Sequence, residues 1–245
     1  MVVFYAFCRT MDDLADDPTL PSEMRAASLD AWQAGLANGF ENPTILQSQV
    51  IEMRDRCGIP NDLLECVIDG CRMDLQVQRF QTWDNLSDYI WKVACVVGLI
   101  SIRLFGCQDP ASERYAVALG RALQLTNILR DIGEDLDNGG RIYLPLEDLV
   151  RFGYTEADLA NRVHDKRFLE LMSFETKRAE GFYREAAEAL TAGDRRALRP
   201  ARIMGEIYHR LLETMRRDGF RVFDRRYRIS RVRKLAILSK HLIAD

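Results

Sequence analysis

The sequence is poor in the two residues that most often interrupt regular secondary structure. Its 245 residues include only 15 glycines and 7 prolines. A fold of many short strands needs frequent turns, and those turns draw on glycine and proline. No stretch keeps an apolar/polar alternation long enough to build a sheet. With 47% hydrophobic and 29% charged residues, the composition favours a globular protein made of long helices.

The sequence also lacks cysteine spacings typical of metal sites, and it lacks a targeting signal. Six cysteines and three histidines are scattered along the chain, with no Cys-x-x-C pair and no cluster at zinc spacing. We therefore expect reduced, mostly buried thiols and a cytoplasmic location. The sequence shows no signal peptide and no Gly-rich dinucleotide-binding motif. The longest uncharged run, Val93 to Ile102, has ten residues, too few to span a bilayer.

Charge is distributed unevenly. The net charge is −3, yet residues 194–245 carry 15 lysines and arginines against 6 aspartates and glutamates. Such a basic segment suits nucleic acid, an anionic membrane surface or a diphosphate. No nucleic-acid-binding motif accompanies it, so we expect no nucleic-acid partner. Most of these arginines alternate with acidic and apolar residues, which is typical of a solvated helix face. Peripheral association with a membrane is a second interpretation of the basic segment.

Helical periodicity and helix-end signals predict a single all-α domain spanning residues 1–245. The expected helices cover residues 2–16, 22–38, 43–57, 62–80, 84–105, 110–136, 165–191, 200–217 and 230–243, with short helical turns before residue 161.

An acidic motif runs along the first expected helix, from Tyr5 to Asp16. Tyr5, Arg9, Asp12 and Asp16 follow one another at spacings of four, three and four residues, so they form one stripe. Apolar neighbours surround this stripe, and we expect the helix to be mostly buried. Buried carboxylates that repel each other are costly unless a cation neutralises them. An acidic face in contact with solvent is the competing interpretation.

A second acidic motif occupies the sixth expected helix. Asn127, Asp131 and Asp135 lie four residues apart on one face, flanked by Arg130 and Glu134. The loop that follows Asp135 superficially resembles a calcium-binding loop. Its twelfth position is leucine instead of a bidentate glutamate, which argues against calcium.

Paired acidic faces suit the departure of a diphosphate. Mg²⁺ prefers a few carboxylates together with phosphate oxygens, and it neutralises charge on a leaving group. Ionisation of an allylic diphosphate leaves a carbocation, which an apolar cavity would shield from water. Aromatic rings can stabilise such a cation; candidates are Phe4, Tyr89, Trp91 and Tyr208. Aromatic residues in such positions more often simply pack in the core than stabilise a cation. Tyr208, which lies in the basic region, is the strongest candidate for cation stabilisation.

The residues around both motifs resemble the squalene/phytoene synthase family, whose members join two prenyl diphosphates head to head. The resemblance runs through essentially the whole chain. Tyr5 to Asp16 and Leu123 to Asp135 match the family's two aspartate-rich motifs. Two further segments also match: Tyr89 to Gly98 matches a Tyr-x-x-x-Val-Ala-x-x-Val-Gly helix, and Arg141 to Pro145 matches an Arg-x-Tyr-x-Pro element. The resemblance implies an isoprenoid-synthase helical bundle with a central active-site cavity.

The resemblance also implies roles for individual residues. Asp12, Asp16, Asn127, Asp131 and Asp135 would hold Mg²⁺. Arg9, Arg130, Arg141 and Arg225 would bind diphosphate oxygens, and Tyr5, Gln124, Tyr143 and Tyr208 would line the reaction centre. NADPH is expected only if the product is squalene. Family members usually have a further helix before the Tyr5 stripe, which we expect to be missing here.

The resemblance implies a prenyltransferase that condenses two farnesyl diphosphates to presqualene diphosphate, and then to squalene or dehydrosqualene. A phytoene synthase acting on geranylgeranyl diphosphate is the first alternative. A head-to-tail prenyl synthase or terpene cyclase would have a different second motif. A non-catalytic homologue serving as an assembly or adaptor protein would be expected to lose acidic ligands, and all five remain here.

Overall fold

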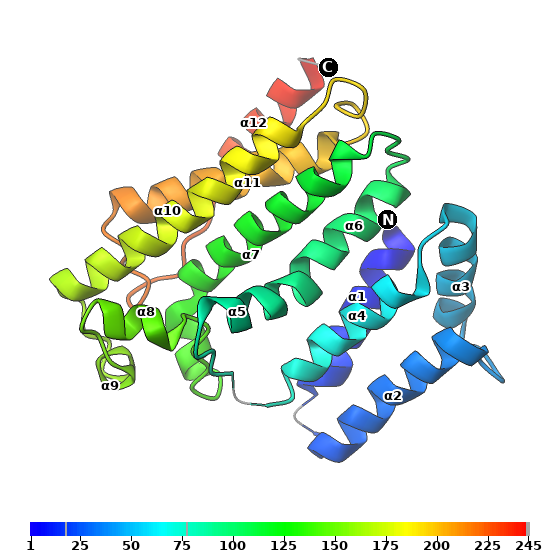
Figure 1. The fold of residues 1–245 in the computed structure, drawn as a ribbon, viewed down its shortest axis with the longest axis horizontal. Helices are drawn as coiled ribbons and strands as arrows, with labels where there is room; N and C mark the ends of the chain where they lie inside the picture. Colours follow the sequence, from blue (N-terminus) through cyan, green and yellow to red (C-terminus); the bar gives the residue numbers. More distant parts are fainter. Residues whose placement is uncertain (18, 77, 244–245) are drawn as a thin grey trace.

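The computed structural model describes residues 1–17, 19–76 and 78–243, and the described chain is all-α (Figure 1). The helices are α1 (Val2–Asp16), α2 (Ser22–Asn38), α3 (Ile45–Cys57), α4 (Asn61–Met73), α5 (Trp83–Ile90), α6 (Val96–Leu104), α7 (Ala111–Asp137), α8 (Leu146–Arg151), α9 (Glu156–Ala160), α10 (Lys166–Ala189), α11 (Arg199–Arg217) and α12 (Arg231–Ile243). A π-helical turn, η1 (Trp91–Cys95), joins α5 to α6. The all-α fold class is thereby confirmed, while the extent of a single domain stays a prediction.

Helix α7 is the central element of the bundle. Figure 1 shows α1 to α4 on one side of it and α8 to α12 on the other, with α5 and α6 alongside. Close backbone contact with η1 depends on Gly120, where a Cβ would lie 2.9 Å from the Cα of Cys95. Any larger residue there would push the two helices apart.

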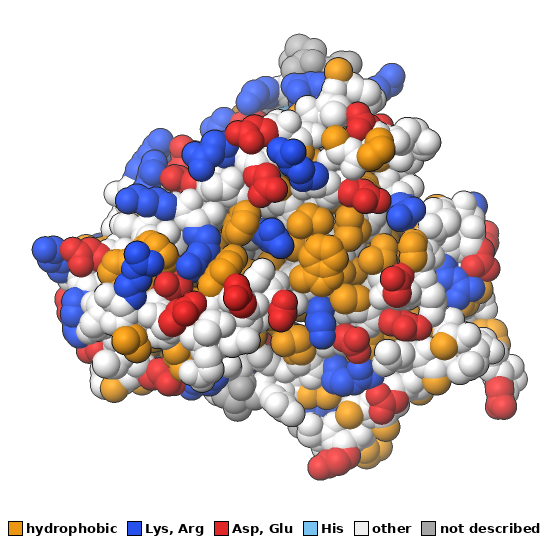
Figure 2. Space-filling model, viewed as in Figure 1, with side chains coloured by type: hydrophobic (Ala, Val, Ile, Leu, Met, Phe, Trp, Pro, Cys, Tyr) orange, Lys and Arg blue, Asp and Glu red, His pale blue; other side chains and the backbone are white. Residues whose placement is uncertain are grey.

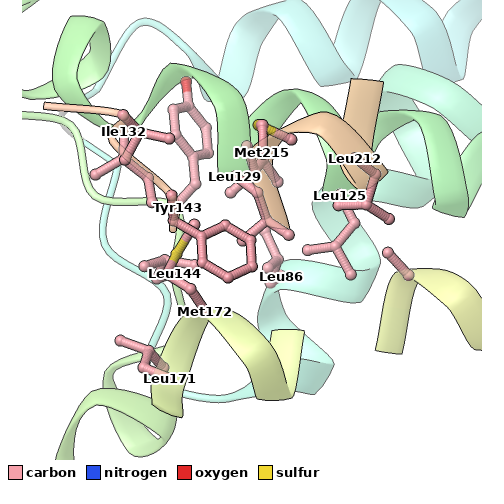
Figure 3. Packing of buried hydrophobic residues seen from close by; sticks show 14 of the residues in the cluster. Leu86, Leu125, Leu129, Ile132, Tyr143, Leu144, Leu171, Met172, Leu212 and Met215 are labelled. Atoms are coloured by element: carbon pink, nitrogen blue, oxygen red, sulfur yellow. The ribbon is translucent and has the colours of Figure 1, made fainter. Parts of the chain in front are cut away.

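Apolar side chains from one face of α7 fill the largest part of the core. Figure 3 shows Leu125, Leu129 and Ile132 of α7 beside Leu212 and Met215 of α11. A second group of buried residues joins α1 to α4 and to Val96 and Ile100 of α6. The face of α7 opposite to this core is therefore free to carry polar residues.

The predicted fourth helix was wrong at its end: it stops at Met73 instead of residue 80. Asp74 and Leu75 form a turn, and residues 78–81 pair with the segment that follows α7. The Ile142 amide donates to the Gln78 carbonyl (3.2 Å), and the Leu146 amide donates to the Phe80 carbonyl (2.9 Å). These long-range hydrogen bonds replace those that a continued helix would make within itself.

By length and composition alone, the segment Trp83–Leu104 could cross a membrane. This was not expected from the sequence, because the uncharged run within the segment has only ten residues. In the structure the segment contacts α7 on one side and α4 on the other. Helices packed in this way are typical of the core of a bundle. Tyr89 of α5 is buried in the core and Val93 of η1 packs against it, while Trp91 between them is 37% exposed.

Candidate active site

The first acidic stripe lies on the surface of α1, which corrects the expectation that it is buried. The helix turns Phe4, Phe7 and Met11 into the core. Tyr5, on the stripe, is 71% exposed. Arg9 pairs with Asp13 one turn further along (2.7 Å), and both side chains are exposed. Because the stripe is exposed, its carboxylates do not need a bound cation to offset a cost of burial, so burial gives no reason to expect a ligand there.

The second acidic motif is half-buried on α7 and is in contact with two arginines. Arg130 Nε donates to Asp131 Oδ1 at 2.8 Å. Arg226, from the segment between α11 and α12, lies 3.3 Å from Asp131 and 2.9 Å from Glu134. That segment passes over Gly133, where a Cβ would lie 2.6 Å from the Val222 carbonyl oxygen. Gly133 thus allows the basic segment to reach the acidic motif.

Arg141 connects the two motifs. After α7, Gly139 and Gly140 adopt φ values of +80° and +68°, a conformation that favours glycine. The chain then turns back, and the Arg141 amide donates to the Asp135 carbonyl oxygen (2.9 Å). The Arg141 guanidinium reaches Asp16 Oδ1 on α1 at 3.4 Å. The charge of the same guanidinium also acts on the Asp135 carboxylate, so Arg141 links acidic residues more than a hundred positions apart in the sequence.

Asp74 is a further acidic residue of this region that the sequence patterns did not indicate. The hydroxyls of Tyr89 and Tyr143 both donate to Asp74 Oδ1, at 3.1 and 3.3 Å. Burial raises the pKa of Asp74 to about 6, although the two tyrosines and Arg141 act in the opposite direction. One local signal was present: Asp74 directly follows α4, where the helix dipole disfavours a negative charge.

Arg130 also joins Tyr208 of α11 to the second motif. Burial works against the charge of Arg130, but its interactions with Asp131 and Tyr208 outweigh burial and raise its pKa. Gln124 lies one turn before Asn127, with 3.5 Å between its Oε1 and the Asn127 amide nitrogen. The structure thus brings Tyr208 and Gln124 to the same region as the second motif.

Arg225 does not join this group. Its guanidinium pairs with the Asp218 carboxylate and lies 5.0 Å from the centre of the Tyr227 ring. Its neighbour Arg226 takes the contact with the acidic motif instead. In an extended segment, consecutive side chains point in opposite directions, so the sequence could indicate the pair of arginines but not which one faces α7.

The oxygen atoms of both motifs fit a hard divalent cation. Asn127 Oδ1 is buried and lacks a hydrogen-bond partner, although buried polar atoms normally have one. Among residues 1–17, 19–76 and 78–243, no three His, Cys, Asp or Glu side chains lie close enough together to hold an ion by themselves. A Mg²⁺ ion commonly completes its coordination with phosphate oxygens and water. Asp12, Asp16, Asn127, Asp131 and Asp135 stay predictions as its ligands.

Two carboxyl groups, one in each motif, have raised pKa values. Burial, together with the charges of Asp131 and Glu134, raises the pKa of Asp135 to about 7. Asp12 lies on the exposed stripe, but partial enclosure by its neighbours, together with the charge of Asp16, raises its pKa. Each additional positive charge at this site would lower these pKa values. The two motifs are therefore arranged to gain from binding a cation.

This arrangement predicts a pH-dependent metal affinity. A carboxyl group must lose its proton to bind a cation. Below about pH 7 Asp135 is protonated, so affinity for Mn²⁺, used as a paramagnetic probe, should fall by up to about tenfold per pH unit. Above pH 7 it should level off. Titrations between pH 5.5 and 8.5 would measure this, with Asp135→Asn as the control that flattens the curve; a flat curve in the unchanged protein would contradict it.

An apolar pocket of about 370 Å³ lies next to the first stripe. Residues from α1, α6, α7 and α11 line it, among them Phe4, Tyr5, Val97, Leu119, Leu123 and Met204. Figure 2 shows a continuous patch of apolar side chains in the middle of this face, bordered by acidic and basic residues. Of the predicted cation-stabilising aromatic residues, Phe4 lines the pocket, Tyr89 contacts Asp74, and Trp91 is 37% exposed.

Comparison with known proteins agrees with this geometry. The model of the squalene/phytoene synthase family matches residues 1–233. A phytoene synthase of Arthrospira platensis is 36% identical, over 96% of this chain and 80% of its own length. A presqualene diphosphate synthase of Rhodopseudomonas palustris is 34% identical, over 99% of this chain and 87% of its own length.

Two solved structures share the fold with a TM-score of 0.82 each. One is a squalene synthase, HpnC, from Alicyclobacillus acidocaldarius, 30% identical over 89% of this chain and 82% of its own. The other is a dehydrosqualene synthase in complex with a ligand, 29% identical over 99% of this chain and 84% of its own.

Proposed function

The chain belongs to the squalene/phytoene synthase family, and from that premise we propose that it condenses two farnesyl diphosphates to presqualene diphosphate with the help of Mg²⁺. The family supplies the coarser statement, that this is a prenyltransferase acting head to head on prenyl diphosphates with a divalent metal. The head-to-tail alternative is thereby set aside, and so is the non-catalytic adaptor. The farnesyl substrate, the product and the identity of the metal are our proposal.

The observation that supports it best is the position of Arg141. Its guanidinium lies 3.4 Å from Asp16 of the first motif and lowers the pKa of Asp135 in the second. A planar guanidinium binds phosphate oxygens in pairs. A diphosphate bound at this point would lie between both acidic motifs, within reach of the arginine that already joins them.

The protein's own residues then have distinct tasks. Arg141, Arg130 and Arg226 bind and orient the diphosphate groups. Bound Mg²⁺, held by the carboxylates and Asn127, would neutralise the charge of the leaving group. The apolar pocket receives a prenyl tail and excludes water from the cation that forms when the C1–O bond breaks. That bond breakage releases one diphosphate. The double bond of the second substrate then attacks the cation, and loss of one proton closes the cyclopropane ring.

A second candidate is phytoene synthesis from two geranylgeranyl diphosphates. Sequence identity to a phytoene synthase of Arthrospira platensis reaches 36%, slightly above the 34% to the presqualene diphosphate synthase. The two solved structures of higher similarity are instead a squalene and a dehydrosqualene synthase, which favours the shorter substrate. NADPH enters this proposal only for a squalene product, and the cytoplasmic, membrane-peripheral location stays a prediction.

The test is incubation with radiolabelled farnesyl or geranylgeranyl diphosphate, with Mg²⁺, and with or without NADPH. We expect presqualene diphosphate from farnesyl diphosphate, and loss of turnover when EDTA removes the metal. Conversion to squalene that requires NADPH would extend the reaction by one reductive step. Turnover of geranylgeranyl diphosphate alone would support the second candidate, and no turnover of either substrate would overturn both.

A further inference from the structure

We propose that Leu119, together with Tyr115, limits the length of the prenyl chain that the apolar pocket accepts. The two side chains separate that pocket from a second hollow, of about 440 Å³, between α10 and α11. Tyr115 and Leu119 line both spaces. This inference rests on the head-to-head reaction proposed above and concerns its choice between farnesyl and geranylgeranyl chains.

The wall between the two spaces is one helical turn of α7. Tyr115 and Leu119 are four residues apart and point in the same direction. Both are buried, with 4% and 6% of their surface exposed. Both belong to one buried cluster with Ile102, Ala186 and Leu198, and packing within this cluster holds them in place. A prenyl tail that reaches them must therefore stop.

Helix α11 holds Leu119 in place from the other side. A Cβ at Gly205 would lie 3.1 Å from Leu119 Cδ1, closer than an ordinary van der Waals contact. Leu119 can therefore keep its present position only because residue 205 is glycine. A larger residue at 205 would push the leucine toward the apolar pocket and shorten the space for the tail.

The second hollow offers apolar surface directly behind the leucine. Ala186, Ala187 and Leu190 contribute to its lining, and Glu180 and Glu206 lie in the same hollow. The two glutamates are already paired, Glu180 with Arg216 (2.9 Å) and Glu206 with Lys240 (2.9 Å). A tail longer by one isoprene unit would thus meet the leucine first, and removal of the leucine would give it apolar surface beyond.

The experiment compares three variants by the ratio of kcat/KM for geranylgeranyl diphosphate to that for farnesyl diphosphate. Leu119→Ala joins the two spaces and should raise the ratio at least about tenfold, the order expected for added room in an apolar pocket. Leu190→Ala removes the same atoms from a residue that lines the second hollow alone, which a tail stopped at Leu119 does not reach, and should leave the ratio unchanged. Gly205→Ala should lower it.

The outcomes separate this inference from the proposed function. Turnover by Leu119→Ala with an unchanged ratio, or an unchanged enzyme that prefers geranylgeranyl diphosphate, would overturn the role of Leu119 and leave head-to-head condensation intact. An unchanged enzyme that converts neither substrate would instead overturn the function. If thermal melting shows that Leu119→Ala is unfolded at the assay temperature, Gly205→Ala decides: alanine is a good helix former, and a ratio that does not fall contradicts the proposal.

Discussion

Replacement of Asp131 by asparagine is expected to lower kcat/KM by about 1000-fold or more while leaving the protein folded. A lost carboxylate at the metal removes several kcal/mol of charge stabilisation from the transition state, and about 4 kcal/mol corresponds to that factor. The asparagine keeps one oxygen that can accept from Arg130 Nε, which now donates to Asp131 Oδ1 at 2.8 Å. It also removes repulsion with Asp135, whose pKa Asp131 raises.

Steady-state kinetics with Mg²⁺ and a thermal melt would check both parts. The melting temperature should shift by no more than about 3 °C, since roughly 1 kcal/mol corresponds to a few degrees in a chain of this size. Asp137→Asn is the matched control: it lies on the same helix, is exposed, and pairs with Arg162. Full activity in Asp131→Asn would show that the metal site has been assigned to the wrong face of α7.

Replacement of Arg141 by methionine should lower kcat/KM by about 100-fold. The variant removes the guanidinium that lies 3.4 Å from Asp16 and that lowers the pKa values of Asp74 and Asp135. Binding of the diphosphate then loses a charge-assisted contact, worth about 2–3 kcal/mol. The pH at which metal binding levels off should rise above about 7, because Asp135 loses a cation that favours its charged form.

A lysine at position 141 separates the effect of the positive charge from that of the planar guanidinium group. Arg141→Lys keeps the positive charge but cannot bind two oxygens in one plane, so its kcat/KM should fall between those of the methionine variant and the unchanged enzyme. Arg162→Met is the control. It removes an arginine that pairs with the exposed Asp137 and that belongs to neither acidic motif. Retention of kcat/KM within about threefold in Arg141→Met would contradict a role in binding the diphosphate.

Most helices could be predicted because their signals are local. Thr44 forms a capping box with Gln47, and Gly58 ends α3 in a left-handed conformation, as such residues commonly do. The end of α4 could not be predicted in this way. Residues 78–80 leave the helical pattern because they pair with residues 142–146, and no local signal reports a partner more than sixty residues away.

The sequence by itself determined which side chains share a helix face. The spacing of Asp12 and Asp16, and that of Asn127, Asp131 and Asp135, follows from the helical repeat, and the family motifs follow from the order of residues. The tertiary structure alone decided what each face meets. It left the first stripe exposed, brought Arg141 to Asp16, chose Arg226 over Arg225, and placed Asp74 under two tyrosines. The physical reason is that helical periodicity acts over a few residues, whereas these contacts depend on how whole helices pack.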